Sequence, residues 1–310
     1  MTLVAANGDI HLKSVLIATD FSEASDKALR HALAIARHYG AKLYLVHVVS
    51  SLGFNLVGAD AINLATETVR RDVRQLENRL IQSGDLTGFP YEVIVCQGYV
   101  WDKLDQIINQ EQIELVVIGT HARRGFGKLL LGSVAEHIFR NASCLVLTVG
   151  PGSLQDSPVG GTRAIRPFLF ATDFSEPSLH ALPYAISSAN HFGAKLVLLH
   201  VISDTTMPDD GFLPSAGDVM KFRENVRLNG LRGLETLLSR QPKLAVTPEP
   251  MVEIGSPAEK ILEVADMLKS DAVIMGLHHK ASIGVASHMP WATAYGVVCG
   301  ACCSVLTVRD

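Results

Sequence analysis

The chain contains an internal repeat that spans about half of its length. The segment ATDFSE occurs at 18–23 and again, letter for letter, at 171–176, which is 153 positions later. At the same offset HYGAKL at 38–43 returns as HFGAKL at 191–196. A repeat of this length is a whole domain rather than a short solenoid unit. The 310 residues therefore predict two tandem copies of one domain.

A turn-rich stretch separates the two copies. It begins at Gly150-Pro151-Gly152-Ser153 and continues through Pro158 to Gly160-Gly161, with few apolar side chains to bury. Gly and Pro at this density favour turns and linkers over regular elements. The predicted organisation is a first domain at 1–149, a linker at 150–163 and a second domain at 164–310.

Each copy alternates short apolar runs with helical patterns. In the first copy, strands are predicted from apolar runs at 14–19, 43–49, 91–96, 115–119 and 144–149. Helical spacing of apolar residues predicts helices between them, at 22–38, about 65–80, 101–108 and from 132 onward. Buried strands that alternate with helices indicate an α/β fold with a parallel, doubly wound sheet.

Composition excludes several classes of partner and of location. A net charge of −4 and a pI near 6.3 provide no basic field for nucleic acid or an anionic membrane. No apolar run has the length of a membrane span, and residues 1–12 lack the pattern of a signal peptide. The five cysteines are an odd number, which argues against a secreted disulfide framework. We expect a cytoplasmic protein with reduced thiols.

The predicted fold locates a candidate binding site. In doubly wound sheets, ligands bind beyond the carboxyl ends of the strands, where the strand order reverses. In the first copy these positions are the loops at 19–22, 48–51 and 119–131. The third loop contains glycines and the cations Arg123, Arg124 and Lys128, and it leads into a helix, which suits a phosphate group. The alternative is a surface loop whose glycines only make turns.

This third loop is not a P-loop. Ala122 stands where a Walker A motif requires its first glycine, and Leu129 follows Lys128 where Ser or Thr is required.

Three motifs together resemble the universal stress protein family over two copies, at about 13–149 and 165–308. They are the ATDFSE turn, the GAKL…HV second strand, and the loop that ends in Gly132-Ser133. The resemblance implies a five-stranded parallel sheet in each copy, in the order 3-2-1-4-5, flanked by helices. Some members of the family bind ATP, with or without Mg²⁺. For this chain the resemblance implies that Asp20 contacts the nucleoside, that the backbone at Val48 recognises adenine and that the glycine loop holds the phosphates. The implied site residues are Ala18, Thr19, Asp20, Val48, Gly119, Thr120, His121, Ala122, Arg123, Gly132, Ser133 and Val134.

The chain departs from the family pattern in two places. Ala122 replaces a glycine, and its methyl group requires a negative φ or a more distant phosphate. The second copy keeps Asp173 and His200-Val201, but Met289-Pro290 or Trp291-Ala292 stands where Gly-Ser should open its last helix. We predict that the second copy is degenerate for a triphosphate, while a nucleoside or a structural partner role remains open.

The other polar candidates have plain structural alternatives. Asp20 and Asp173 each precede a helix, so a carboxylate that only accepts local N–H bonds is the alternative to ligand contact. His47 and His200 lie within apolar strands, which predicts core histidines without a chemical role. No metal site or catalytic residue is predicted.

The cysteine and histidine clusters lack the partners that a metal site needs. The C-x-x-C pair Cys299 and Cys302 has no second ligand pair and leads into a strand, which favours buried thiols over a metal or dithiol site. The histidines at 278, 279 and 288 have no acidic or cysteine partner at a fixed spacing.

The expected function is ATP binding in stress response or signalling, with at most slow ATP hydrolysis, because no catalytic constellation stands out. An enzyme of the same fold that hydrolyses nucleotides and a nucleotide-free interaction or scaffold protein remain the alternatives. The resemblance also implies that the two domains pair through their last strands, at 144–149 and 303–308. A homodimer of chains is left open and would use other surfaces.

Overall fold

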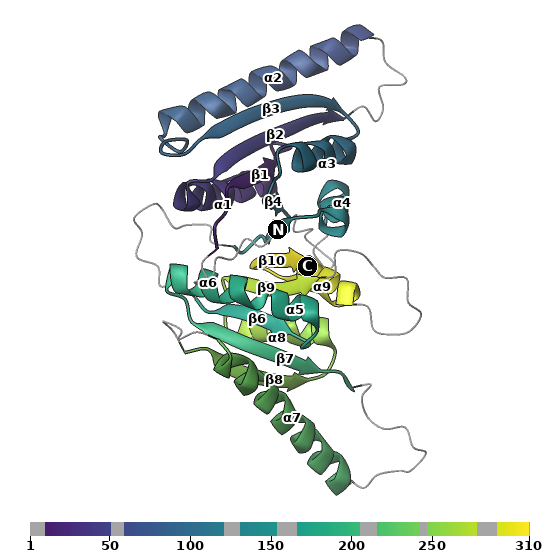
Figure 1. Ribbon diagram of the computed structural model, residues 1–310. Coiled ribbons are helices and arrows are strands. Elements are labelled where there is room, and N and C mark those ends of the chain that lie inside the picture. Colours follow the sequence, from purple (N-terminus) through teal and green to yellow (C-terminus); the bar gives the residue numbers. More distant parts are fainter. Residues whose placement is uncertain are drawn as a thin grey trace. The chain divides into compact units, whose positions relative to one another are not determined.

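The computed structural model describes residues 10–50, 59–120, 131–153, 166–204, 216–241, 247–277 and 290–309. They fall into two compact units, one containing His11–Pro151 and the other Gly152–Asp310. Each unit is a parallel sheet with helices packed against it (Figure 1).

In the first unit the strand order is β3-β2-β1-β4-β5, and every neighbouring pair is parallel. Its strands are β1 Ser14–Ala18, β2 Lys42–Ser50, β3 Tyr91–Gly98, β4 Leu115–Gly119 and β5 Leu145–Val149. Its helices are α1 Glu23–Tyr39, α2 Ala59–Gln82, α3 Val100–Gln110 and α4 Ser133–Asn141.

The second unit repeats this topology as β8-β7-β6-β9-β10. Its strands are β6 Phe168–Thr172, β7 Leu196–Ile202, β8 Glu249–Ile254, β9 Ala272–Leu277 and β10 Ser304–Arg309. Its helices are α5 Glu176–His180, α6 Leu182–Phe192, α7 Ala216–Ser239, α8 Pro257–Met267 and α9 Pro290–Gly300. The predicted tandem doubly wound fold, with the order 3-2-1-4-5 in each domain, is confirmed.

Strand β1 shows why the apolar runs are unbroken. Val15, Leu16 and Ile17 are all fully buried, because β1 lies between β2 and β4 and is covered on both faces. The following helix is bounded as its sequence predicts. Ser22 caps α1 by accepting the Ser25 N–H at 3.2 Å, and Gly40 ends it in a left-handed conformation with φ 62°.

One helix differs between the two copies. α1 is continuous, whereas the corresponding helix of the second unit breaks at Ala181 into α5 and α6. Pro183, which stands where the first copy has Arg30, lacks the N–H that would bond the carbonyl of Leu179. The Ala181 N–H instead bonds the Ser178 carbonyl at 3.2 Å, which tightens the last turn of α5.

The start of the predicted linker is packed within the second unit. The Gly152 N–H bonds the Cys302 carbonyl at 2.8 Å, and Ser153 shares a 3.0 Å hydroxyl hydrogen bond with Ser304. Residues 154–165 lie outside the described part of the chain. Within the described part, no helix combines the length and the apolar character that crossing a bilayer requires.

Candidate functional site

The turn after the first strand is built identically in both domains. Phe21 and Phe174 adopt left-handed backbone conformations, with φ 62° and 64°, which are strained for a residue with a side chain. In each case the threonine two residues earlier stabilises the turn by accepting the Phe N–H with its hydroxyl oxygen. The N–O distance is 3.1 Å from Phe21 to Thr19 and 3.0 Å from Phe174 to Thr172. The preserved ATDFSE letters thus specify a backbone shape.

A histidine on the second strand holds each turn in place. His47 Nδ1 lies 2.7 Å from the Thr19 carbonyl oxygen, and its ring stacks on Phe21 with centroids 4.9 Å apart. His200 repeats the contact with Thr172 at 2.9 Å and with Phe174 at 4.5 Å. Burial lowers the pKa of His47 by more than the Thr19 hydrogen bond and the Asp20 charge raise it. Both histidines are half-buried and support the turn, and that they have no chemical role stays a prediction.

Asp20 and Asp173 are exposed at the tip of this turn. Asp20 Oδ1 accepts the Ser22 N–H at 3.0 Å, and Asp173 Oδ1 accepts both the N–H and the hydroxyl of Ser175, at 3.0 and 2.5 Å. Both carboxylates therefore make the local hydrogen bonds that were predicted as the alternative to ligand contact. Partial desolvation raises the pKa of Asp173, but hydrogen bonds from Ser175 and Ser178 outweigh it, so the pKa is lowered and the carboxylate is ionised at neutral pH.

The carboxyl ends of β2, β1 and β4 lie side by side in the first unit. Strand pairing brings Ala18 beside Val46 and Ile17 beside Val117, so the turn at Asp20, Val48 and Gly119 share one edge of the sheet. The described site residues at this edge and at the start of α4 are Ala18, Thr19, Asp20, Val48, Gly119, Thr120, Gly132, Ser133 and Val134. His121, Ala122 and Arg123 lie outside the described residues.

Gly119 has a packing role that the sequence analysis missed. A Cβ atom added there would lie 2.2 Å from the backbone oxygen of Ala24, in the first turn of α1. Gly276 repeats the arrangement in the second unit, where the added atom would lie 1.9 Å from the backbone oxygen of Pro177. Both strands need glycine so that the helix start can approach, whether or not a ligand binds.

The N-terminus of α4 is open. Gly132 is its N-cap and has no side chain that could accept the first N–H groups of the helix, and Gly132 and Ser133 are both exposed. A Cβ atom added to Gly132 meets no atom of the described residues within 4 Å. The first N–H groups of a helix lack partners within it and carry partial positive charge, so this end suits an anion.

The last helix of the second unit begins differently. At the end of α4, the Ala142 N–H donates a hydrogen bond to the Ile138 carbonyl. At the end of α9, the Ala301 N–H makes the same bond to the Val297 carbonyl. Counting back from these matching ends aligns Ser133 with Ala292 and Gly132 with Trp291. α4 begins at Ser133, which aligns with Ala292, but α9 already begins at Pro290. It therefore starts two residues earlier than α4 does in this alignment, and its first residue has no N–H. Of the two alignments left open by the sequence, the structure selects Trp291-Ala292.

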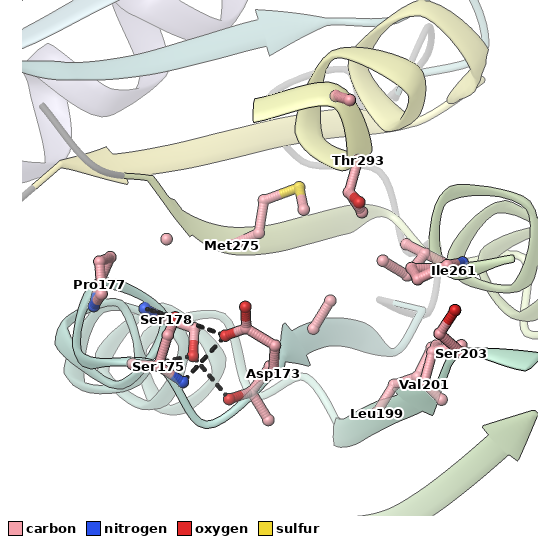
Figure 2. A pocket seen from close by; sticks show the side chains of 15 residues that line it. Asp173, Ser175, Pro177, Ser178, Leu199, Val201, Ser203, Ile261, Met275 and Thr293 are labelled. Atoms are coloured by element: carbon pink, nitrogen blue, oxygen red, sulfur yellow. Dashed lines mark hydrogen bonds between the residues drawn. The ribbon is translucent and has the colours of Figure 1, made fainter. Parts of the chain in front are cut away.

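The second unit contains a cavity of about 460 Å³ at the carboxyl ends of β6, β7 and β9. Figure 2 shows the side chains of Asp173, Met275 and Ile261 around a shared space. The described lining residues are Ala171, Thr172, Asp173, Ser175, Pro177, Ser178, Leu199, Val201, Ser203, Pro257, Ile261, Met275, Gly276, Ala292 and Thr293. Sequence reasoning singled out Asp173 and Val201 but missed Ser203, Ile261 and Met275, for which the only signal was position near the end of a strand or the start of a helix.

The cysteines of the second unit differ in exposure. Cys303 is buried, and burial raises the pKa of its thiol to about 12. Cys302, which precedes β10 in a bend, is exposed, and Cys299 is half-buried. The expectation of buried thiols is therefore wrong for Cys302 and only partly right for Cys299. Among the described residues no group of three His, Cys, Asp or Glu side chains is placed to hold a metal ion. The histidines at 278, 279 and 288 lie outside them.

The strand order and parallel pairing define a tandem α/β protein of the doubly wound class, with a candidate site at the carboxyl ends of the central strands in each domain. The sequence profile of the universal stress protein family matches residues 11–150 and 164–309, and the chain belongs to that family.

Individual relatives agree with this assignment. A universal stress protein of Methanocaldococcus jannaschii is 28% identical over 147 residues, covering 47% of this chain and 86% of the relative. One of Thermus aquaticus is 30% identical over 138 residues, covering 44% and 98%. The crystal structure of a universal stress protein from Archaeoglobus fulgidus shares the fold, with a TM-score of 0.63 and 19% identity over 98% of this chain and 99% of that one.

Proposed function

We propose that this protein binds ATP in its first domain and acts in stress response or signalling in the cytoplasm, with at most slow ATP hydrolysis. The observation that carries the proposal is the exposed start of α4 at Gly132-Ser133, the helix that follows β4 in the chain, together with the shared edge of β1, β2 and β4. The helix end supplies N–H donors and partial positive charge for phosphate oxygens. The resemblance of the ATDFSE turn and the second strand to ATP-binding relatives supplies the nucleoside end of the site.

In the described part of the second domain, the last helix does not repeat the start of α4. Because α9 begins two residues earlier and opens with Pro290, the helix end that is free in α4 is continued by further residues. We therefore propose one ATP site per chain.

Calorimetric titration of the full chain with ATP, with and without Mg²⁺, tests the proposal. The expected stoichiometry is one ATP per chain, with an adenine nucleotide detected by mass spectrometry of material released from freshly purified protein. A flat isotherm together with nucleotide-free protein would favour the interaction-protein alternative. Rapid release of phosphate would favour an enzyme.

Replacing Asp20 tests the nucleoside end of the site. Asp20→Ala is expected to weaken ATP binding by about 1–3 kcal/mol, because a ligand hydrogen bond to a charged acceptor is lost. Asp20→Asn retains an acceptor oxygen for the Ser22 N–H and so separates the turn from the ligand contact. Asp173→Ala is the corresponding substitution in the second domain. As the control, it should leave the ATP isotherm unchanged. If Asp173→Ala has the larger effect, the two domains have been ranked in the wrong order.

We also propose that the two domains pair through β5 and β10. Each of these strands ends its own domain's sheet order, and an uncovered strand edge is a liability that pairing removes. Val146→Pro and Val305→Pro, which each remove a backbone donor, are expected to loosen the pair. Small-angle scattering should then show a larger envelope, and limited proteolysis in the linker should accelerate. An unchanged envelope and cleavage rate would contradict this pairing.

A further inference from the structure

The outermost strands β3 and β8 occupy equivalent places in the two units but differ along their free edges. Each ends the strand order of its own unit (Figure 1). In the first unit, α2 and α3 each contact both β2 and β3, so these helices cover the faces of the sheet. Within the described residues, no strand pairs with the outer side of β3 or of β8. An edge of this kind is a template for pairing with another chain.

The pairing of β3 with β2 fixes which of its backbone groups point outward. The Leu43 N–H donates to the Pro90 carbonyl at 2.9 Å, and Leu43 is in register with Tyr91. Because alternate residues of a strand direct their N–H and C=O groups to opposite sides, Pro90 and every second residue after it face β2. The residues that direct these groups outward are therefore Tyr91, Val93, Val95 and Gln97.

The same argument places prolines on the outer edge of β8. The Gly255 N–H donates to the Ile202 carbonyl at 2.9 Å, and Ile202 is in register with Ile254. Gly255 and every second residue before it therefore face β7, and positions 248, 250, 252 and 254 face outward. Two of these are Pro248 and Pro250, which have no N–H to donate. Proline on the open side of an edge strand is one of the devices that prevent edge pairing.

β3 lacks this protection. By the registers with the adjacent strands, Tyr91 and Val93 stand where the second copy has its two prolines, so β3 keeps all of its outward N–H groups. Tyr91, Val93 and Val95 are half-buried aromatic or β-branched residues, the types that favour strand pairing. Glu92 is the one charged residue of β3, and its carboxylate is paired with Lys42 at 2.7 Å.

From this asymmetry we propose that the outer edge of β3 pairs with the β3 edge of a second copy of this chain. Dimers with a twofold axis are the commonest assemblies, and such an axis relates two identical edges of one sheet in the antiparallel sense. The pairing leaves β5 and β10 for the contact between the two domains of one chain. The proposal goes beyond ATP binding and does not depend on it.

The backbone of β3 is self-complementary when this pairing is centred on Ile94. Val93 of one copy then lies opposite Val95 of the other, and Tyr91 lies opposite Gln97. Every outward N–H and C=O group of β3 thereby meets a strand partner. β-branched side chains also lie opposite each other, which stabilises a cross-strand pair.

The residues that face β2 accept the same register. Ile94 lies opposite its own copy, and Glu92 lies opposite Cys96, so no two like charges face each other. Any other centre leaves an outward N–H of β3 without a strand partner. A centre on Glu92 would in addition bring two like charges together.

A proline copied from β8 tests the edge. Val93→Pro gives β3 the residue that β8 has at this position, and it keeps the hydrogen bonds to β2 because the lost N–H points outward. In sedimentation velocity of the full chain, we expect a wild-type dimer and a dissociation constant raised about tenfold or more in Val93→Pro, since two hydrogen bonds are lost per dimer. Val252→Pro, at an outward position of β8, is the matched control and should remain a dimer. Thermal unfolding verifies the fold of both variants.

A cysteine cross-link tests the register independently of the proline. Ile94 directs its N–H and C=O to β2, so it forms a non-hydrogen-bonded pair with its own copy, and the Cα separation of about 4.5 Å in such pairs suits a disulfide. Diamide oxidation of Ile94→Cys is expected to give a covalent dimer, linked at position 94 by peptide mass spectrometry. Met251→Cys, the equivalent change in β8, is expected to give no such link. Both variants carry Cys302→Ser, which removes the exposed native thiol.

Three results would overturn the proposal. They are a wild-type chain that stays monomeric at high micromolar concentration, which would leave the β3 edge to a strand of another protein, a dimer equally stable in a folded Val93→Pro variant, and a link at position 94 that forms no faster than one at position 251. If Val93→Pro does not fold, the cross-link decides alone. A chain that dimerises through β3 but binds no ATP would refute the proposed function and leave this inference standing.

Discussion

The variant Gly132→Trp is expected to lose ATP binding by about 100-fold or more, the equivalent of two charge-assisted hydrogen bonds. The indole would occupy the space in front of the first N–H groups of α4, where the proposal places the phosphates. Gly132 has φ −61° and ψ 155°, a conformation open to any residue, and within the described part of the chain an added Cβ meets no atom within 4 Å. The domain is therefore expected to fold normally and to lose only the ligand.

The control for this variant is Gly132→Ala, which adds a methyl group to the same open space. We expect the ATP affinity of Gly132→Ala to stay within about threefold of wild type, since an N-cap Gly→Ala change costs a few tenths of a kcal/mol to about 1 kcal/mol of helix stability. Calorimetric titration measures both variants, and thermal unfolding verifies their fold. Wild-type ATP affinity in Gly132→Trp would remove the start of α4 from the binding site.

Much of the fold could be predicted from the sequence because local and long-range signals agree. The strands β1 and β4 are covered on both faces, so their runs of apolar residues stand out from the amphipathic helices between them. Ser22 and Gly40 mark the ends of α1 through capping chemistry that depends on neighbouring residues alone. Because the second copy repeats the sequence motifs of the first, the same topology could be predicted for it.

Features that depend on three-dimensional neighbours were missed or misjudged. The early start of α9 became visible only once its end could be matched to that of α4 through the Ala142 and Ala301 hydrogen bonds. The cavity of the second domain is lined by Ile261 and Met275, among other residues, and these two look like ordinary core residues in the sequence. Gly119 was assigned to the phosphate loop because the family pattern has glycine there, and its contact with Ala24 involves a residue 95 positions away.

That contact leads to a second large effect. Gly119→Ala is expected to destabilise the first domain by about 3 kcal/mol, the upper end of the usual cost of overpacking, because the neighbouring atom is a backbone oxygen that cannot rotate away. The corresponding fall in Tm is roughly 10 °C for a domain of this size. Gly276→Ala should do the same to the second domain, where the added atom would lie 1.9 Å from the Pro177 oxygen.

Differential scanning calorimetry of the full chain measures both variants, and Gly132→Ala again serves as the control, now for an unhindered glycine. The two possible roles of Gly119, in packing and in phosphate binding, predict different results for Gly119→Ala. If the glycine is needed for packing, Gly119→Ala lowers the Tm of the ligand-free protein. If it is needed only for close approach of a phosphate, the Tm of the ligand-free protein stays at the wild-type value and the ATP affinity falls. Because Gly276 repeats the packing in a domain whose last helix does not repeat the start of α4, a matching loss of stability in Gly276→Ala would assign the glycine to the fold rather than to the ligand.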